Sequence, residues 1–579
     1  MGPLLLVSAL LVWPLRSGAQ GDQLPLAEHL DQDQNVTLRW GFDETRDEIM
    51  FELTVKTTGW VGLGFSPNGG MAGADIVIGG VSPNGSTYFT DRHAVGQSLP
   101  LVDARQSYTI LSLAEADGQT IMKFQRSIQS CDGDDFAIST SPIKLIYAFG
   151  LTDEIKYHSS RRGTKEVNLL KYSPRTSSTD GSYFDFTANN FTVPPVHTYY
   201  HCRIVKLPAL GSKHHVYRIE PIIQNPDLVH HMLLYYCSPS VNETLTGMCY
   251  SGQHHAFHMC MGAMATWAVG GGGFEIPEAA GISIGGDDDV SYYRLEIHYN
   301  NQEQVSGRID DSGLRFHYTP VLRQYDASIL SVGLIVDKSY FIPPNATSFK
   351  SYALCKTSLI SQLLPSPVPD LNIFMVMLHT HLAGRKIRVG HFRNGAQIDF
   401  LALDEHYDFE LQQALLLGKI KNVKLGDELV LECTYNTVDR TKLTELGLAT
   451  TDEMCFAYIF YYPAIDINNC WSIPDIGSID TAIGAANHSM AVSMYESMTW
   501  DADTVEKYQD ALKNVNQYVF LDNRQNDHAV QMGYIPELKA TPSADCRAVQ
   551  GEVTPVAGSA AAHTPGITLL LWLAALRLL

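Results

Sequence analysis

The stretch M377-L-H-T-H-L-A-G384 continues the apolar run L371-N-I-F-M-V-M377, which is typical of a buried strand. Side chains alternate between the two faces of a strand, so we expect His379 and His381 to point to one side, together with Met375 and Met377. Two imidazoles on one face often share a metal ion, because neutral imidazole nitrogen binds zinc, copper, iron and nickel. An H-x-H pair also occurs as two surface histidines. The stretch therefore predicts a β fold and, alone, leaves the metal open.

The rest of the chain extends this strand-rich character. With 579 residues the chain is too long for one hydrophobic core, and roughly three or four domains are expected. Between Leu38 and Gly150, the segment I49-M-F-E-L-T-V55 alternates apolar and polar residues, and T58-G-W-V-G-L-G-F-S-P-N-G-G70 is rich in turn residues. We predict a β-sandwich of about a hundred residues there, and a mainly β fold for the whole chain.

Shifts in composition divide the chain into parts. A basic, Ser/Thr-rich stretch around H158-S-S-R-R-G-T-K165 indicates a linker, and Y340-F-I-P-P-N345 marks a boundary, because consecutive prolines do not fit inside a sheet. Modest helical character runs from Tyr495 to Leu512. The predicted parts are a β-sandwich at 35–155, a linker at 156–190, a β domain at 191–345, a further β domain at 346–500 and an extension at 501–566.

The N-terminus and the cysteines indicate the secretory pathway. The apolar start M1-G-P-L-L-L-V-S-A-L-L-V-W13, followed by small residues, predicts a signal peptide at residues 1–19. An even count of ten cysteines fits an oxidising compartment, so we expect disulfides. Six N-x-S/T sequons predict glycosylation at Asn35, Asn84, Asn190, Asn242, Asn345 and Asn487. The functional region should therefore be lumenal or extracellular.

The last residues, 567–579, are apolar but contain Arg577 and are short for a bilayer span, which needs about twenty residues. With the small residues from Ser559 they resemble a glycolipid-anchor signal. A short single-pass segment and an untethered tail are the alternatives. We expect membrane attachment through this tail. The net charge of −21 and the lack of a basic run argue against a nucleic-acid partner.

Two more histidine clusters accompany the H-x-H pair. V229-H-H-M-L-L-Y-Y236 contains His230 and His231, and L295-E-I-H-Y299 carries His298. Adjacent residues of a strand face opposite ways, so His230 and His231 reach one ion only at a strand end or a bulge. Three imidazoles around one ion suit copper or zinc.

Four segments carry a resemblance to a known family. H230-H-M232, L295-E-I-H-Y299, H379-T-H-L-A-G-R385 and E453-M-C455, in this order and at these separations, resemble the copper type II, ascorbate-dependent monooxygenases. The run G59-W-V-G-L-G-F-S-P67 with M71-A-G-A-D-I-V-I-G79 is similar to DOMON domains, which favours the dopamine-hydroxylase-like branch. The resemblance implies a DOMON-like β-sandwich followed by two copper-binding β-sandwich domains of jelly-roll type.

The resemblance also implies roles for individual residues, with two coppers per chain as cofactors. His230, His231 and His298 would hold the electron-transfer copper. His379, His381 and Met454 would hold the copper that binds oxygen and substrate, with His379 as a catalytic residue. A thioether is a soft ligand that stabilises Cu(I), and zinc sites rarely use one. Tyr200, two residues before Cys202, would lie near the active site as a further catalytic residue, although an ordinary core aromatic is the alternative.

Five disulfides are implied by the same resemblance. They pair Cys202 with Cys249, Cys237 with Cys260, Cys355 with Cys470, Cys433 with Cys455, and Cys131 with Cys546. The Cys433–Cys455 pair would brace Met454. Since all ten cysteines are then used, any homo-oligomer would be non-covalent.

The implied function is a copper- and ascorbate-dependent monooxygenase that hydroxylates an activated C–H bond of a small molecule with O2. Ascorbate would be the electron donor. Segments beside the ligands, such as M232-L-L-Y-Y-C237, carry no carboxylate for an ammonium group, so dopamine is not favoured as the substrate. The alternative function is a non-catalytic binding protein that works through its DOMON-like module. In that module Met71 or His93 are candidate haem ligands, and neither has an identifiable partner in the sequence.

Overall fold

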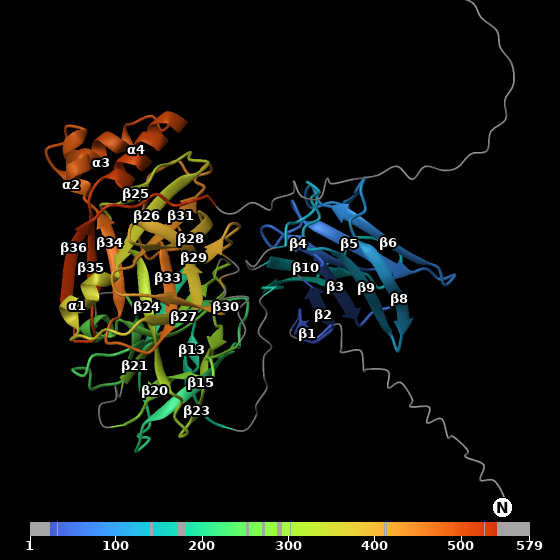
Figure 1. Ribbon diagram of the computed structural model, residues 1–579, viewed down its shortest axis with the longest axis horizontal. Helices are drawn as coiled ribbons and strands as arrows, with labels where there is room; N and C mark the ends of the chain where they lie inside the picture. Colours follow the sequence, from blue (N-terminus) through green and yellow to red (C-terminus); the bar gives the residue numbers. More distant parts are fainter. Residues whose placement is uncertain are drawn as a thin grey trace, which may run out of the picture. The chain divides into compact units, whose positions relative to one another are not determined.

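The computed structural model confirms the mainly β fold (Figure 1). It describes residues 24–31, 33–43, 45–138, 143–170, 181–250, 254–268, 273–286, 292–301, 303–409, 412, 414–525 and 527–540. The expected signal peptide and the apolar tail at 567–579 lie outside these ranges. None of the helices in the described part combines the length and apolarity of a membrane span.

The N-terminal sandwich consists of two antiparallel sheets. In β3 the predicted alternation is present, with Ile49, Phe51 and Leu53 buried, and the core includes Leu63 and Val77 of the opposite sheet. The first sheet has the order β1 (Leu26–His29), β2 (Val36–Asp43), β3 (Glu48–Val55), β9 (Gln119–Ser127) and β8 (Thr109–Ala116). The second has the order β11 (Arg162–Val167), β10 (Ile143–Phe149), β4 (Val61–Ser66), β5 (Asp75–Val81), β6 (Thr87–His93) and β7 (Leu101–Val102).

Two strands take up part of the linker expected at 156–190. β11 pairs with β10 inside the sandwich, and β12 (Ser182–Thr187) pairs with β23 (Gly313–Thr319) of the next domain. The basic residues Arg162 and Lys165 made this stretch look like a linker, but they lie in β11, an edge strand, where charged residues are common.

The second domain packs a five-stranded sheet against part of a longer sheet. The five-stranded sheet has the order β17 (Leu245–Met248), β14 (Thr198–Lys206), β21 (Tyr292–Asn300), β16 (Val229–Tyr236) and β18 (Gly262–Ala268). The core between them contains Met232, Leu295 and Phe316. Smaller elements are β13 (Phe191–Thr192) with β22 (Ile309–Asp310), and the 3₁₀ turn η1 (His255–Met259).

One continuous 12-stranded sheet joins the second and third domains. Its main path is β12, β23, β15 (His214–Ile222), β20 (Ala280–Ile284), β24 (Tyr325–Leu334), β33 (Phe456–Tyr462), β27 (Leu371–His379) and β30 (Ala414–Val423), with β19 (Phe274–Glu275) beside β15. Strand β24 enters both cores: Ala327 and Ile329 belong to the second-domain core, whereas Val332 and Leu334 belong to the third. The two domains therefore share backbone hydrogen bonds as well as side-chain contacts.

The third domain adds a four-stranded sheet with the order β26 (Phe349–Lys356), β31 (Glu428–Tyr435), β28 (Gly384–Arg393) and β29 (Ala396–Asp404). The pair β25 (Phe341–Ile342) and β32 (Thr444–Glu445) lies at the expected boundary near residue 345. Figure 1 shows the helices α2 (Ile476–Ala482), α3 (His488–Glu496) and α4 (Ala502–Asn514) grouped together; the turn η2 (Thr357–Leu359) and α1 (Ile360–Leu363) follow β26.

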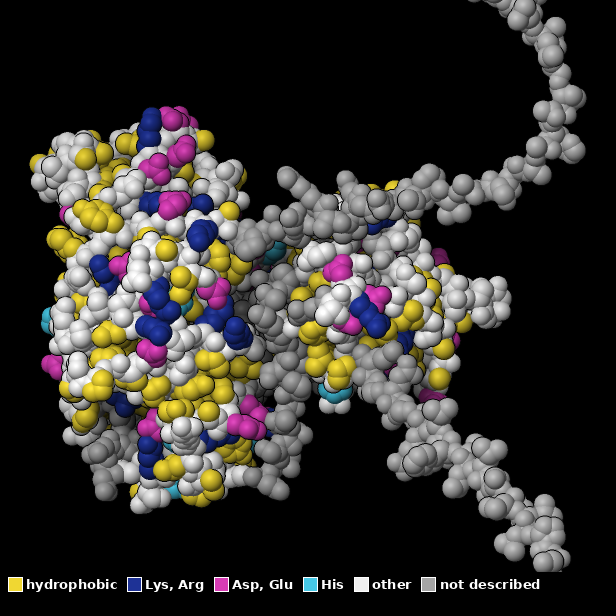
Figure 2. All heavy atoms as spheres, in the orientation of Figure 1, with side chains coloured by type: hydrophobic (Ala, Val, Ile, Leu, Met, Phe, Trp, Pro, Cys, Tyr) yellow, Lys and Arg dark blue, Asp and Glu magenta, His cyan; other side chains and the backbone are white. Residues whose placement is uncertain are grey.

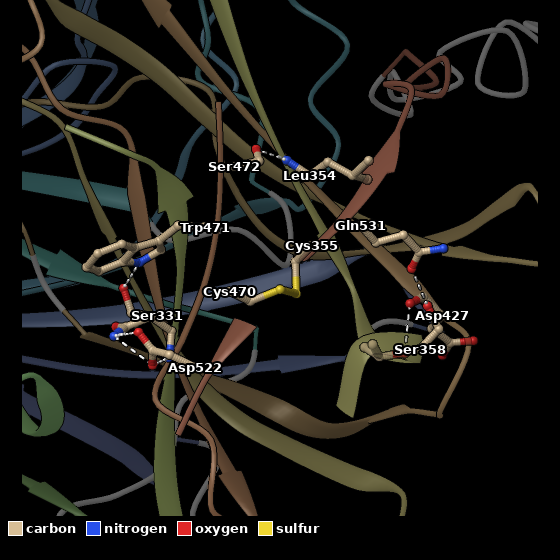
Figure 3. Close-up of a disulfide and its surroundings, with 12 residues drawn as sticks. Ser331, Leu354, Cys355, Ser358, Asp427, Cys470, Trp471, Ser472, Asp522 and Gln531 are labelled. Carbon is tan, nitrogen blue, oxygen red and sulfur yellow. Dashed lines mark hydrogen bonds between the residues drawn. A yellow bond between two sulfur atoms is a disulfide. The ribbon is translucent and has the colours of Figure 1, made fainter. Parts of the chain in front are cut away.

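The extension predicted at 501–566 is, in its described part, an integral layer of the third domain. Strand β34 (Asn469–Pro474) pairs with β35 (Gln517–Asp522), which pairs with β36 (His528–Gly533). The buried side chains of Val519 and Leu521 alternate along β35. Figure 3 shows Ser358 next to β26 donating to Gln531 of β36 at 3.2 Å. Short strands with mixed polarity explain why the sequence pattern missed them.

Within the described residues four disulfides join cysteine pairs, and they are four of the five pairs that the family resemblance implies. They join Cys202 with Cys249, Cys237 with Cys260, Cys355 with Cys470 and Cys433 with Cys455. Cys355–Cys470 links β26 to β34, beside the bond that Leu354 N donates to Ser472 Oγ at 2.8 Å (Figure 3). Cys546, expected to pair with Cys131, lies outside the described residues.

The surface is mixed in charge, as Figure 2 shows for one face, where cationic and anionic side chains are interspersed. The predicted glycosylation asparagines lie in accessible positions, of which Asn35 is half-buried and the others are exposed: Asn84, Asn190, Asn242, Asn345 and Asn487.

We predict that Gly333→Ala destabilises the joined domains. Gly333 lies in β24, and an added Cβ would sit 2.2 Å from a ring carbon of Phe456 and 2.5 Å from the backbone oxygen of Cys455. Overpacking against fixed backbone should cost about 1–3 kcal/mol of unfolding free energy. Gly96→Ala is the control, because a Cβ there meets nothing within 4 Å. Thermal unfolding followed by circular dichroism compares them, and equal unfolding temperatures would contradict the shared-strand packing.

Candidate metal centre

A strand irregularity brings three histidines of the second domain together. The register between β16 and β21 shifts between Val229 and His231, so His230 lies in a bulge, which is one of the two geometries that the sequence allowed. His231 is then paired directly with His298 of the neighbouring strand. All three imidazoles are buried.

The three rings approach one another through the same nitrogen. His231 Nδ1 lies 3.3 Å from the Nδ1 atoms of both His230 and His298. One potential ligand atom from each ring lies within 4.8 Å of the others. The Nδ1 atom of a neutral His231 either donates one proton or accepts one, so it cannot make good hydrogen bonds to both neighbouring Nδ1 atoms. A metal ion that accepts one lone pair from each ring would remove this conflict.

Burial keeps these rings neutral. Desolvation, helped by the neighbouring His379 ring, lowers the pKa of His230 to about 3. The pKa values of His231 and His298 are also well below the usual range, first because of burial and then because of the other imidazoles. A neutral imidazole offers a lone pair, which is the form that binds metals.

Tyr200 supports this group from β14. Its ring stacks on His298 at a centroid distance of 4.5 Å with 5° between the planes. On the same strand as His298, the buried Glu296 accepts from Tyr250 Oη at 2.8 Å and lies 3.3 Å from Arg294. Tyr200 contacts a candidate ligand, and its role beyond that contact remains a prediction.

The H-x-H pair of the third domain sits partly in a turn. Strand β27 ends at His379, so the expectation that His381 continues the strand face is wrong. The two rings still lie close, with centroids 5.2 Å apart. The chain turns because Tyr407 Oη donates to Thr380 O at 2.7 Å and accepts from Thr380 N at 3.0 Å.

Hydrogen bonds fix the orientation of both rings. His379 Nδ1 donates to Gln412 Oε1 at 2.6 Å, and Gln412 Nε2 donates to Phe409 O at 2.8 Å. His381 Nδ1 donates to Asp452 O at 3.2 Å, and its buried Nε2 has no hydrogen-bond partner. Each ring therefore leaves Nε2 available for a metal. Burial lowers the pKa of His379 to about 4, so this ring is also neutral.

Glu453 connects this turn to the segment that carries Met454. Its carboxylate accepts from Ala383 N at 2.6 Å and from His381 N at 2.9 Å. Tyr435 Oη donates to Met454 O at 2.8 Å, and the next residue, Cys455, is bonded to Cys433 of β31. Burial raises the pKa of Glu453 to about 7, against the effect of the two backbone N–H groups. The third candidate ligand is thus held by its backbone on both sides.

The two candidate ligand sets adjoin each other. The ring centroids of His231 and His379 are 5.4 Å apart, across the junction of the two domains. Phe409 stacks on His230 at 4.0 Å and lies 6.1 Å from His381. Five imidazoles and one phenyl ring thus form a single buried cluster that draws on both domains.

Sequence reasoning did not single out Gln412, Phe409, Tyr407 or Glu453 as functional. Glu453 had a signal, because it stands next to Met454 in E453-M-C455. The other three lie in a stretch without periodic pattern, and only the fold brings them to the histidines.

The two haem candidates of the N-terminal sandwich have different surroundings. Met71 lines a cavity of about 740 Å³ together with Trp60, Tyr147 and His158. The His93 ring instead contacts the Asp103 carboxylate.

The donor set fits a soft or borderline metal. Five neutral imidazoles suit copper, as would the thioether of Met454, which follows the Glu453 that bonds to the His381 backbone, whereas hard cations prefer oxygen ligands. Imidazoles fixed by hydrogen bonds through the opposite nitrogen, as in His379 and His381, are typical of metal ligands.

Comparisons with known proteins agree with this geometry. Residues 184–306 match the family described as copper type II ascorbate-dependent monooxygenase, N-terminal domain, and residues 325–480 match its C-terminal domain. Residues 32–150 match the DOMON domain.

Several curated proteins are similar along most of the chain. DBH-like monooxygenase protein 2 of Mus musculus is 37% identical, covering 96% of this chain and 92% of that protein. DBH-like monooxygenase protein 1 of Homo sapiens is 39% identical, covering 81% and 78%. Dopamine beta-hydroxylase of Homo sapiens is 33% identical, covering 79% and 76%.

We predict that Gln412→Leu weakens copper binding at the H-x-H pair by about 10–100-fold, because the acceptor that orients His379 is lost. Gln412→Glu keeps an acceptor for His379 but loses the bond that Gln412 Nε2 donates to Phe409 O, so it should bind copper more tightly than Gln412→Leu. Titration against a competing copper chelator should resolve two equivalents, of which one is weakened in Gln412→Leu. Equal affinities in the two variants would contradict an orienting role for Gln412.

Proposed function

We propose a function from one established premise: this chain belongs to the copper type II, ascorbate-dependent monooxygenase family. The proposed reaction inserts one oxygen atom of O2 into an activated C–H bond of a small molecule. The other oxygen atom leaves as water. The reaction also consumes two protons and two electrons, and each of two ascorbate molecules supplies one electron. The observation that carries the proposal is the cluster of five buried, neutral imidazoles shared by two domains.

The proposed ligands fall into two sets of three. His230, His231 and His298 would hold one copper, and His379, His381 and Met454 would hold the other. When bound, copper supplies the one-electron chemistry and the oxygen activation that side chains lack. With the proposed domain boundaries at 191–345 and 346–500, one ligand set belongs to each β domain.

The side chains around the ligands prepare them for this task. Burial keeps the imidazoles unprotonated at neutral pH, so protons do not compete for the nitrogens. Gln412 and the Asp452 carbonyl direct Nε2 of His379 and His381 away from their hydrogen bonds. Phe409 covers His230 and excludes water from that side. Tyr200, stacked on His298, is proposed as a positioning residue.

Two buried carboxylates close in sequence to the proposed ligands already have hydrogen-bond or ion-pair partners. Glu296 is bound to Tyr250 and Arg294, and Glu453 accepts from two backbone N–H groups. Neither is left to receive a substrate ammonium group. We therefore propose a small-molecule substrate without assigning dopamine to that role.

Oxygen uptake with ascorbate tests the proposed function. The copper-loaded protein is incubated with phenethylamines, indoleamines and peptides ending in glycine, and labelled O2 reports which product gains oxygen. The alternative, a non-catalytic binding protein that keeps the scaffold, predicts no ascorbate-dependent uptake with any of them.

A pair of variants tests the assignment of roles. Met454→Leu keeps side-chain volume, so it should cost under about 1.5 kcal/mol in folding, while removing the thioether that favours Cu(I). His298→Ala should interrupt the electron supply from the other set. Both should abolish hydroxylation, and only Met454→Leu should change carbon monoxide binding to the reduced protein. If Met454→Leu hydroxylates at the parental rate, the roles are wrongly assigned.

We propose that the secreted or lumenal chain is attached to membranes through residues 567–579. Cells expressing the protein should release it on treatment with a phospholipase that cleaves glycolipid anchors. Release only by detergent, with Trp572 still present by mass spectrometry, would show a retained tail instead.

A further inference from the structure

A row of side chains crosses six strands of the continuous sheet on one face. Residues that pair directly across neighbouring strands point to the same face of a sheet. The row follows this pairing from β27 through β33, β24, β34 and β35 to β36. Its members are His379, Phe456, Gly333, Trp471, Phe520 and Val530. The row begins at a proposed copper ligand and ends on a strand that, among the described strands, pairs only with β35.

The members next to His379 are aromatic rings in contact. Because Gly333 has no side chain, the Phe456 ring lies over it, and a Cβ there would be 2.2 Å from a ring carbon of Phe456. The Phe456 and Trp471 rings meet edge to face, with centroids 5.7 Å apart. Trp471 Nε1 donates to Ser331 Oγ at 3.0 Å, which fixes the indole on this face (Figure 3). The glycine thus allows a continuous aromatic surface across β33, β24 and β34.

A second row runs beside the first, toward the same edge. Ile473 of β34 pairs with Tyr518 of β35, and Tyr518 pairs with Met532 of β36. The alternate residues of β35, Val519 and Leu521, belong to the core of the third domain. Both rows therefore lie on the face of these strands that is turned away from that core.

Both rows become more exposed toward the edge of the sheet. Phe456, at the inner end, is 6% exposed, whereas Val530 and Met532, at the outer end, are 45% and 51% exposed. Four apolar residues between them are half-buried: Trp471, Ile473, Tyr518 and Phe520. The hydrophobic cores formed by the described residues include none of these four. A contiguous, exposed apolar face of this kind indicates a binding surface.

The chemistry of the two rows selects an apolar ligand. Beyond His379 neither row contains a charged side chain. Asp522, which follows on the same face of β35, already accepts from Asn469 Nδ2 at 2.9 Å. A charged or strongly polar group placed over the rows would lose its hydration without gaining a partner. An alkyl chain or a ring system would instead gain contact with aromatic and aliphatic side chains.

We propose that the two rows bind an extended apolar chain of the substrate, which is therefore a lipophilic small molecule. The inference rests on the proposed function, because the rows start beside His379 and lead away from it. Neighbouring strands are about 4.8 Å apart, so the five spacings from β27 to β36 give a length of about 24 Å. A phenethylamine without an extension would cover only the inner end. Continuity with a proposed copper ligand favours a substrate over a lipid surface or a second copy of the chain.

Phenethylamines that carry a para n-alkyl chain, from methyl to decyl, test the proposal. Below their micelle concentrations they are dialysed against the copper-loaded protein without ascorbate, so that binding is measured without turnover. The dissociation constant should fall about twofold for each added methylene, the gain expected when a methylene is half covered. With ascorbate, the members that are hydroxylated should show a falling KM along the series at similar kcat.

Two variants locate the bound chain. Phe520→Gln removes the ring in the middle of the row, and Val530→Asn removes the apolar group at its outer end. Phe520→Gln should weaken binding of the decyl member about fivefold more than binding of the methyl member. Val530→Asn should act in the same direction, and it decides the matter if Phe520→Gln fails to fold. Ile398→Asn is the matched control, because Ile398 is also a β-branched residue of an edge strand and is 50% exposed.

The outcomes separate this inference from the proposed function. If no member is hydroxylated, the proposed function is contradicted, while the dialysis series still decides whether the rows bind an apolar chain. Affinities independent of chain length in the parent protein, or a parental series in both Phe520→Gln and Val530→Asn, would overturn the proposal. It would also be overturned if these variants keep the series but lose binding to phosphatidylcholine vesicles or lose a parental dimer. The rows would then cover a lipid surface or a second copy.

Discussion

The path of β24 through two hydrophobic cores is the constraint on which the candidate metal centre depends. Its first half packs Ala327 and Ile329 in the second domain, and its second half packs Val332 and Leu334 in the third. Parallel pairing with β20 and antiparallel pairing with β33 fix both domains to the same backbone. The 5.4 Å separation between the rings of His231 and His379 is a result of this shared sheet. Without the shared strand, only side-chain contacts would hold the two domains, and these restrict relative movement less than backbone pairing does.

Within that frame, each candidate ligand set is positioned by a local departure from regular structure. A bulge brings His230 to the imidazoles of His231 and His298. The end of β27 and the turn held by Tyr407 and Glu453 bring His381 beside His379. A regular strand would send the adjacent His230 and His231 to opposite faces. Irregular backbone is therefore concentrated where the chemistry is proposed.

Much of this could be predicted from the sequence, for identifiable reasons. Alternation in I49-M-F-E-L-T-V55 predicts the strand that forms there, and adjacency of His230 and His231 requires a bulge or strand end. Gln412 and Phe409 could not be found in this way, because their importance comes from contacts across the fold and not from spacing. The short strands β35 and β36 were missed because each has only six residues, in which polar and apolar side chains are mixed without a clear period. The end of β27 at His379 depends on hydrogen bonds from Tyr407, a residue far along the chain.

The continuous sheet also limits how this chain can be rearranged in evolution. A recombination event that transferred only one of the two β domains would cut through the strands around β24 and expose a central edge with unpaired backbone groups. Each half would then expose an unpaired strand edge that can pair with other chains and promote aggregation. The two domains are expected to be inherited and exchanged as one unit, despite having two separate cores.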